Sequence, residues 1–124
     1  MCQQLIAFLS FFLLCLNQEQ PLKKLIRGKL VYNTCATAII QIKDPSYFHL
    51  GQKIWQKTPS DVEYEHVFTV KNRCQLVSAN IQTNEEFLFE VAKEDIEETN
   101  CAKCILYDYP PDSILTIGST RKLY

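Results

Sequence analysis

The sequence consists mainly of short runs of alternating apolar and polar residues, and turn residues interrupt these runs about every 8–12 residues. In the clearest run, residues 62–71, every second residue from Val62 to Val70 is apolar, aromatic or His, and most of the intervening residues are polar. Alternation with this period is typical of a strand that buries one face. Strands are predicted over residues 25–32, 36–43, 53–57, 62–71, 74–81, 87–91, 104–109 and 113–118.

Seven or eight short strands without an amphipathic helix are typical of an antiparallel β-sandwich or barrel, and we predict an all-β sandwich. Residues 92–100 have helix-forming composition but few apolar residues, so we interpret them as an acidic loop. Trp55 is expected in the core, as is usual for Trp in such folds.

The composition argues against several classes of function. Thirteen basic and fourteen acidic residues give a formal charge of −1, which argues against a nucleic-acid or polybasic membrane binder. Only three glycines are present, which argues against phosphate-binding loops and dinucleotide fingerprints. The chain has two His and neither a Gly-x-Ser-x-Gly nor a His-Glu-x-x-His motif, so we predict no enzyme and no catalytic residues.

An apolar run over residues 5–16 suits a signal-peptide core and falls short of the roughly 20 residues that span a bilayer. We expect a signal peptide over residues 1–20 and one secreted, extracellular domain over residues 21–124, with no transmembrane span. A membrane anchor or a buried helix is the alternative.

Four of the six cysteines follow the signal peptide: Cys35, Cys74, Cys101 and Cys104. An even number in an oxidising compartment predicts two disulfides. The preferred pairing joins Cys35 and Cys74 to Cys101 and Cys104, one to each, and a 101–104 bridge with a 35–74 bridge stays open. The Cys-x-x-Cys could also hold zinc or exchange thiols, but further ligands in zinc spacing and a βαβ unit are missing. We predict no metal and no cofactor.

Tyr47, Phe48 and His49 occupy a turn-rich stretch and are the candidate ligand-binding tip. His66 falls on the apolar face of residues 62–71 and is expected to be a half-buried rim residue. Basic residues gather near the start of the predicted domain and acidic ones over residues 85–98. We favour solvated faces, with a dipolar binding surface as the alternative.

Several short motifs allow a comparison with a known family. Arg27-Gly28-Lys29-Leu30-Val31-Tyr32-Asn33 opens the domain, and Cys101-Ala102-Lys103 precedes Pro110 and Asp112-Ser113-Ile114 near its end. The chain resembles the nematode transthyretin-like family in these segments, although Tyr32 stands where that family has its first Cys and the family's His-Asp-Cys motif is absent.

The resemblance implies a secreted transthyretin/immunoglobulin-like β-sandwich that binds an extracellular protein, a lipid surface or a small apolar ligand without catalysis. The alternative is a netrin- or inhibitor-like small β domain that acts on an extracellular protease through a processed N-terminal Cys.

Overall fold

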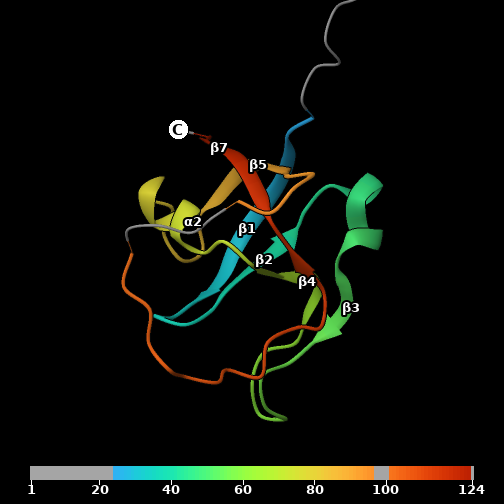
Figure 1. Cartoon of the computed structure of the whole chain (residues 1–124). Helices are drawn as coiled ribbons and strands as arrows, with labels where there is room; N and C mark the ends of the chain where they lie inside the picture. Colours follow the sequence, from blue (N-terminus) through green and yellow to red (C-terminus); the bar gives the residue numbers. More distant parts are fainter. Residues whose placement is uncertain (1–23, 97–100, 124) are drawn as a thin grey trace, which may run out of the picture.

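The computed structural model describes residues 24–96 and 101–123, most of which belong to one sheet and its connections. The strands are β1 (Ile26–Asn33), β2 (Ala38–Ile42), β3 (Gln52–Trp55), β4 (Tyr64–Val70), β5 (Glu86–Val91), β6 (Ile114–Leu115) and β7 (Ile117–Lys122). A 3-10 helix, η1 (Pro45–Leu50), follows β2, and a short α-helix, α2 (Cys74–Ser78), follows β4 (Figure 1). All pairings except β4–β6 are antiparallel, which confirms the predicted all-β, mostly antiparallel fold of short strands.

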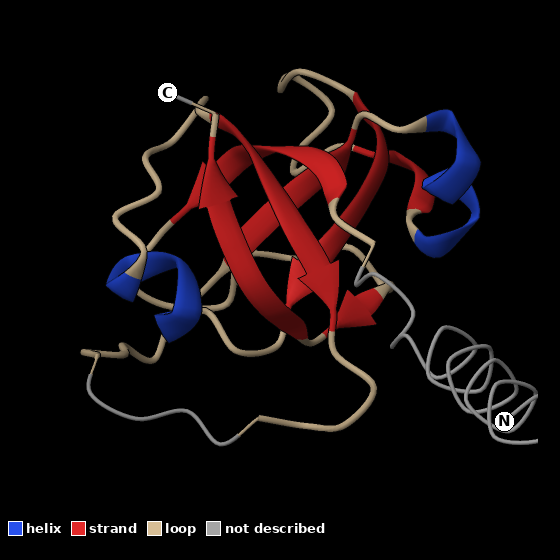
Figure 2. Cartoon of the chain, turned by 90° about the horizontal axis from the view of Figure 1, so that it is seen from above, coloured by secondary structure: helices blue, strands red, loops and turns tan. Residues whose placement is uncertain are grey.

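The sheet is strongly curled, as the crossing strands in Figure 2 show. Its order is β3-β4-β2-β1-β5-β7, and β6 pairs with β4. Because only Thr116 separates β6 from β7, one stretch of chain bridges β4 and β5. The result is a partly open Greek-key barrel with the connectivity of an OB fold, and α2 lies between β4 and β5 in the chain. Opposite walls share one core, as the layers of a sandwich do.

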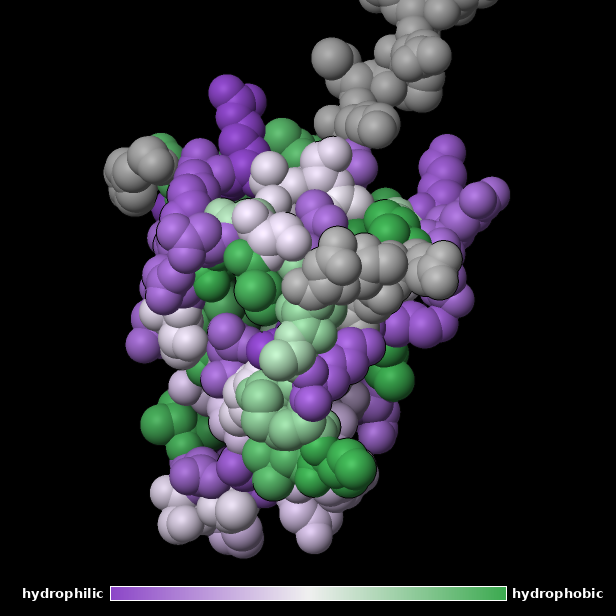
Figure 3. All heavy atoms as spheres, turned by 60° about the vertical axis from the view of Figure 1, so that its left-hand side comes forward, coloured by the Kyte–Doolittle hydropathy of each residue, from purple (hydrophilic) through white to green (hydrophobic). Residues whose placement is uncertain are grey.

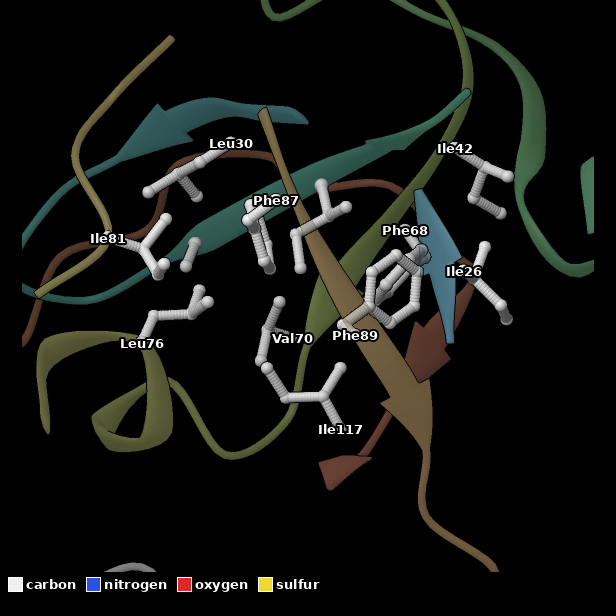
Figure 4. Packing of buried hydrophobic residues seen from close by; sticks show 12 residues of the cluster. Ile26, Leu30, Ile42, Phe68, Val70, Leu76, Ile81, Phe87, Phe89 and Ile117 are labelled. Carbon is white, nitrogen blue, oxygen red and sulfur yellow. The ribbon is translucent and has the colours of Figure 1, made fainter. Parts of the chain in front are cut away.

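Large apolar side chains from the barrel walls and from α2 fill the barrel (Figure 4). The buried members are Ile26, Leu30, Ala38, Ile40, Ile42, Phe68, Val70, Leu76, Ile81, Phe87, Phe89 and Ile117. The ring centroid of Phe89 lies 5.5 Å from that of Phe68 and 6.0 Å from that of Phe87. Gly28 makes room for this packing, because a Cβ there would lie 2.7 Å from the Phe89 ring. The interior is therefore occupied by protein side chains.

A second apolar cluster lies on the outside of the barrel. In β2, Ile40 belongs to the interior cluster while its neighbour Ile39 belongs to the outer one, and both are fully buried. Phe68 and Val67 of β4 divide in the same way. The buried members of this outer cluster are Val31, Ile39, Trp55 and Val67, with Tyr32 and Tyr64 packed against them. The core position predicted for Trp55 is confirmed, and both faces of β2 and β4 are covered.

The strand predicted over residues 74–81 is wrong, because this stretch forms α2 and a turn. Its apolar run is too short for periodicity to separate a strand from a helical turn. Cys74 and Leu76 are buried, and Leu76 packs into the barrel core. Asn80 then takes a left-handed φ of 57°, a conformation that asparagine tolerates better than most residues.

The strand predicted over residues 104–109 is also wrong, since this stretch has no regular structure. Regular alternation along β1 would place Leu30 and Tyr32 on one face, but the register shifts between them. Leu30 therefore joins the interior cluster while Tyr32 packs outside, against Trp55.

The predicted signal peptide over residues 1–20, and residues 97–100 of the predicted acidic loop, lie outside the described residues. Within residues 24–96 and 101–123, neither helix has the length and apolar character needed to cross a bilayer.

Candidate functional site

The residues predicted to form a ligand-binding tip lie on η1. Tyr47 and Phe48 are half-buried and pack against the barrel core, whereas His49 is exposed. The Phe48 ring stacks on that of His66 with centroids 3.8 Å apart, and His66 is half-buried as expected for a rim residue. Gly51 allows this close approach, because a Cβ there would lie 2.7 Å from the His66 backbone. Tyr47 and Phe48 thus have a packing role, and ligand binding by the three residues stays a prediction.

Two disulfides attach the start of the long connection that leads into β6 to the rest of the fold. Cys35 bonds to Cys104 and Cys74 bonds to Cys101, with Cα atoms 5.4 Å and 5.5 Å apart. The preferred pairing, in which Cys35 and Cys74 bond to one each of Cys101 and Cys104, is confirmed, and the structure shows which partner each has. Because all four sulfur atoms are bonded, the Cys-x-x-Cys pair provides two attachment points on the barrel, one at the β1–β2 turn and one at the start of α2.

The connection so attached, residues 101–113, is here called the covering segment. It forms the orange loop at the lower left of Figure 1 and packs on the outer cluster. The indole Nε1 of Trp55 donates a hydrogen bond of 2.9 Å to the Tyr109 carbonyl. The hydroxyl of Thr69 donates one of 3.0 Å to the Pro111 carbonyl. The covering segment is therefore held at its start by sulfur and toward its end by hydrogen bonds.

Asp108 is the polar anchor of the covering segment. It is only 2% exposed, and both oxygens of its carboxylate have partners. The hydroxyl of Tyr32 donates to Oδ1 at 2.8 Å and that of Thr34 donates to Oδ2 at 2.7 Å. The ammonium of Lys57 lies 3.8 Å from Oδ1 and donates to the Tyr32 hydroxyl at 2.7 Å. These partners compensate for burial, because transfer of a charged carboxylate out of water costs free energy unless hydrogen bonds or an opposite charge replace the water.

The same contacts set the protonation of this cluster. Burial alone would raise the pKa of the Asp108 carboxyl, but hydrogen bonds from Thr34, Tyr32 and Thr37 and the charge of Lys57 outweigh it, so the pKa is lowered. The hydrogen bond to Tyr32 and the charge of Asp108 raise the pKa of Lys57. Asp108 and Lys57 are therefore both charged at neutral pH, and their role is to fix the covering segment on the barrel.

Around this anchor the covering segment exposes large apolar side chains. Ile105 is fully exposed, and the exposed fractions of Leu106, Tyr107 and Tyr109 are 53%, 71% and 66%. These four residues are here called the apolar tip. Figure 3, which brings the left-hand side of Figure 1 forward, shows apolar atoms gathered toward the lower end of that face. An exposed apolar cluster of this kind commonly marks a contact surface.

The backbone of the apolar tip is also available for contact. Among the residues that the structure describes, none forms a hydrogen bond with the amide or carbonyl of Ile105, Leu106 or Tyr107. Tyr109 has a left-handed φ of 49°, which costs a residue with a side chain roughly 1–2 kcal/mol. Packing and the Trp55 hydrogen bond hold this strained conformation, a pattern common at functional sites.

The basic and acidic stretches of the sequence lie side by side. Arg27 of β1 pairs with Glu86 of the neighbouring β5 at 2.9 Å, and Lys122 of β7 lies 3.6 Å from Glu85. Such exposed pairs contribute little stability, but they cancel charge locally. This arrangement favours the interpretation of solvated faces over that of a dipolar binding surface.

A shallow depression of about 510 Å³ lies beside β6 and the end of β5. The Asp95 carboxylate at its edge accepts hydrogen bonds from Lys71 at 2.6 Å and from Thr116 at 3.1 Å. These contacts lower the pKa of Asp95, with Lys71 the larger cause. Across the described parts of the chain, no three His, Cys, Asp or Glu side chains come together as metal ligands would.

Comparison of the chain with protein-family models, with curated proteins and with solved structures finds no match. The candidate site therefore rests on geometry alone. The apolar tip escaped sequence reasoning because residues 104–109 read as a strand. The one available signal was Asp108, a charge inside an otherwise apolar and aromatic run that ends in two prolines.

Proposed function

We propose that this chain is a secreted, non-catalytic protein that binds an extracellular protein through its apolar tip. The observation that carries the proposal is the tip itself. Four large apolar side chains remain in water on a segment that disulfides and a buried carboxylate fix in place. A fixed surface of this kind binds with little loss of conformational entropy, which favours affinity.

Secretion is supported by two features. The apolar run over residues 5–16 has the length of a signal-peptide core, with cleavage expected after residue 20 and the domain over residues 21–124. Two disulfides form and persist most readily in an oxidising compartment. The resemblance to the nematode transthyretin-like family agrees with an extracellular binding role without catalysis.

A protein suits the apolar tip better than the other expected partners. A small apolar ligand would need an internal cavity, but aromatic side chains such as Phe87 and Phe89 fill the barrel. A lipid surface would have to accept the backbone groups of residues 105–107, which have no partner among the described residues, and this is costly in hydrocarbon. A protein can satisfy those groups with its own backbone.

A netrin- or inhibitor-like module remains the second candidate, favoured by the small barrel whose covering segment is attached by two disulfides. In its usual form it acts through a processed N-terminal Cys. N-terminal sequencing of the secreted chain tests this mechanism. A start at Cys15 would support it, and a start near Pro21 would exclude it.

The main proposal is tested on the full chain secreted from eukaryotic cells. Labelled protein should bind saturably to intact cells of the source organism, and protease treatment of those cells should abolish binding. The variant Leu106→Asp should lose binding, whereas Val77→Asp, which places the same change on an exposed residue of α2, should keep it. Equal binding of both variants would exclude the apolar tip as the contact surface.

A further inference from the structure

The apolar tip has the features of a segment that a protease would bind as a substrate. Ile105, Leu106 and Tyr107 are consecutive, exposed and outside regular structure. Their backbone groups have no partner among the described residues. Endopeptidases pair with an extended substrate backbone and take successive side chains into separate pockets, so three such residues match that mode of binding.

We propose that Leu106 enters the apolar S1 pocket of an extracellular serine endopeptidase and that the chain inhibits this enzyme. The inference rests on the proposed binding function and names its partner class. It uses a different contact from an N-terminal Cys, and it therefore holds wherever the signal peptide is cleaved.

Leu106 is the best placed of the three side chains. Ile105 branches at Cβ, which makes it stiff and wide near the backbone. The Tyr107 ring packs edge-on against that of Tyr109, with centroids 4.7 Å apart. Leu106 has neither restriction. Its side chain is apolar and has no branch at Cβ, which suits the hydrophobic S1 slot of a chymotrypsin-type enzyme.

Anchors on both sides of Leu106 explain why inhibition would prevail over degradation. Cys104, two residues before it, is bonded to Cys35. Asp108, two residues after it, is buried with hydrogen bonds to Tyr32 and Thr34. Cutting the bond between Leu106 and Tyr107 would therefore leave both new ends attached to the same barrel.

The chemistry balances without any added reagent. Attack by the serine hydroxyl on the Leu106 carbonyl forms an ester and releases the amine of Tyr107, which takes up a proton through the enzyme's His. Because Asp108 keeps that amine beside the ester, the amine can attack it, release the serine and restore the peptide bond. High effective concentration of a tethered amine favours this reversal over hydrolysis.

The test measures residual activity of a chymotrypsin-type endopeptidase on a chromogenic peptide with increasing amounts of the secreted full chain. We expect inhibition with one-to-one stoichiometry, and a loss of roughly 100-fold or more in affinity for Leu106→Asp. Val77→Asp is the matched control and should inhibit as the wild type does. Leu106→Lys should lose that inhibition and instead inhibit a trypsin-type enzyme, whose S1 pocket carries an Asp.

Three results would overturn the inference. One is the absence of inhibition of chymotrypsin-type and elastase-type enzymes. Another is rapid cleavage after Leu106 with full enzyme activity retained. The third is sedimentation of the wild type, but not of Leu106→Asp, with phosphatidylcholine and phosphatidylserine vesicles, which would identify a lipid surface as the occupant. If inhibition is absent, tip-dependent binding to cells would leave the proposed binding function standing.

Discussion

At the residue scale, Asp108 determines how the covering segment sits on the barrel. It is the one buried carboxylate in the covering segment, and it joins that segment to β1, to the β1–β2 turn and to Lys57. Its neighbours Tyr107 and Tyr109 point outward because Asp108 points inward. One charged residue therefore both anchors the segment and exposes the apolar tip.

The change Asp108→Asn should lower the free energy of unfolding by roughly 2–4 kcal/mol. The amide cannot accept from both Tyr32 and Thr34 as the carboxylate does, and it leaves Lys57 without its counter-charge. Urea unfolding of the secreted chain measures the effect. Asp112→Asn changes an exposed carboxyl in the same segment and should shift stability by less than about 0.5 kcal/mol. A similar small shift for Asp108→Asn would contradict the anchoring role.

The lowered pKa of Asp108 also predicts how stability depends on pH. Its folded pKa lies below the ordinary value of 3.8, so the unfolded chain binds the proton more readily. The contribution is therefore complete above the unfolded pKa and is lost as the pH falls from there through the folded pKa. The stability difference between wild type and Asp108→Asn should be constant above about pH 5 and shrink below about pH 4. A constant difference down to pH 2 would show that the carboxylate is not stabilised by folding.

At the element scale, the sequence predicts strands well where a neighbouring strand is available. Residues 36–43 were predicted as a strand and form β2, in which Ile40 packs inside the barrel and its neighbour Ile39 packs outside. The same reasoning failed for residues 104–109, which have strand-like composition but pack over the sheet instead of joining its edge. Strand propensity reflects a fit to a half-buried pleated surface, and whether a partner strand exists is decided by the rest of the chain.

Asn72 shows how one side chain joins two elements. It follows β4, and its amide donates to the Ile117 carbonyl at 2.7 Å and accepts from the Ile117 amide at 2.9 Å. Because Asn72 is buried, its replacement leaves two backbone groups of β7 without partners in a dry site.

We expect Asn72→Ala to lower stability by about 2–4 kcal/mol, since two buried hydrogen bonds are lost and their partners remain. Gln82→Ala removes an exposed side-chain amide and should cost less than about 0.5 kcal/mol. Hydrogen exchange of the β7 amides should accelerate in Asn72→Ala alone. Unchanged protection of β7 would mean that the β5 pairing suffices to hold this strand.

At the scale of the whole molecule, the fold combines a partly open barrel with an external segment attached to it. Short-range patterns sufficed for the fold class, and the cysteine count sufficed to predict two disulfides. Which of Cys101 and Cys104 bonds to Cys35 and which to Cys74 came from the structure alone. The apolar tip did not follow, because its exposure depends on Asp108 meeting Tyr32 and Thr34, which lie more than seventy residues away in the chain. Contacts between such distant residues leave no periodic signal.

The two disulfides allow the barrel and the covering segment to be tested separately. They close loops with sequence separations of 69 and 27 residues, so loop entropy predicts similar stabilisation, each about 3.5–4.5 kcal/mol. Their positions differ, because Cys35–Cys104 lies beside the apolar tip whereas Cys74–Cys101 joins α2 to the start of the segment. Replacing Cys35 and Cys104 with Ser should increase the backbone mobility of residues 102–107, measured as lower NMR order parameters, far more than replacing Cys74 and Cys101.

In both double variants the barrel should persist, because its core draws on β1, β2, β4, β5 and β7 without the covering segment. Far-ultraviolet circular dichroism and protection of the β2 amides measure this. Loss of sheet structure in the Cys35/Cys104 variant would mean that the covering segment is part of the folding unit. In that case the apolar tip would be an exposed edge of the core, and its rigidity would no longer argue for a surface built to bind a partner.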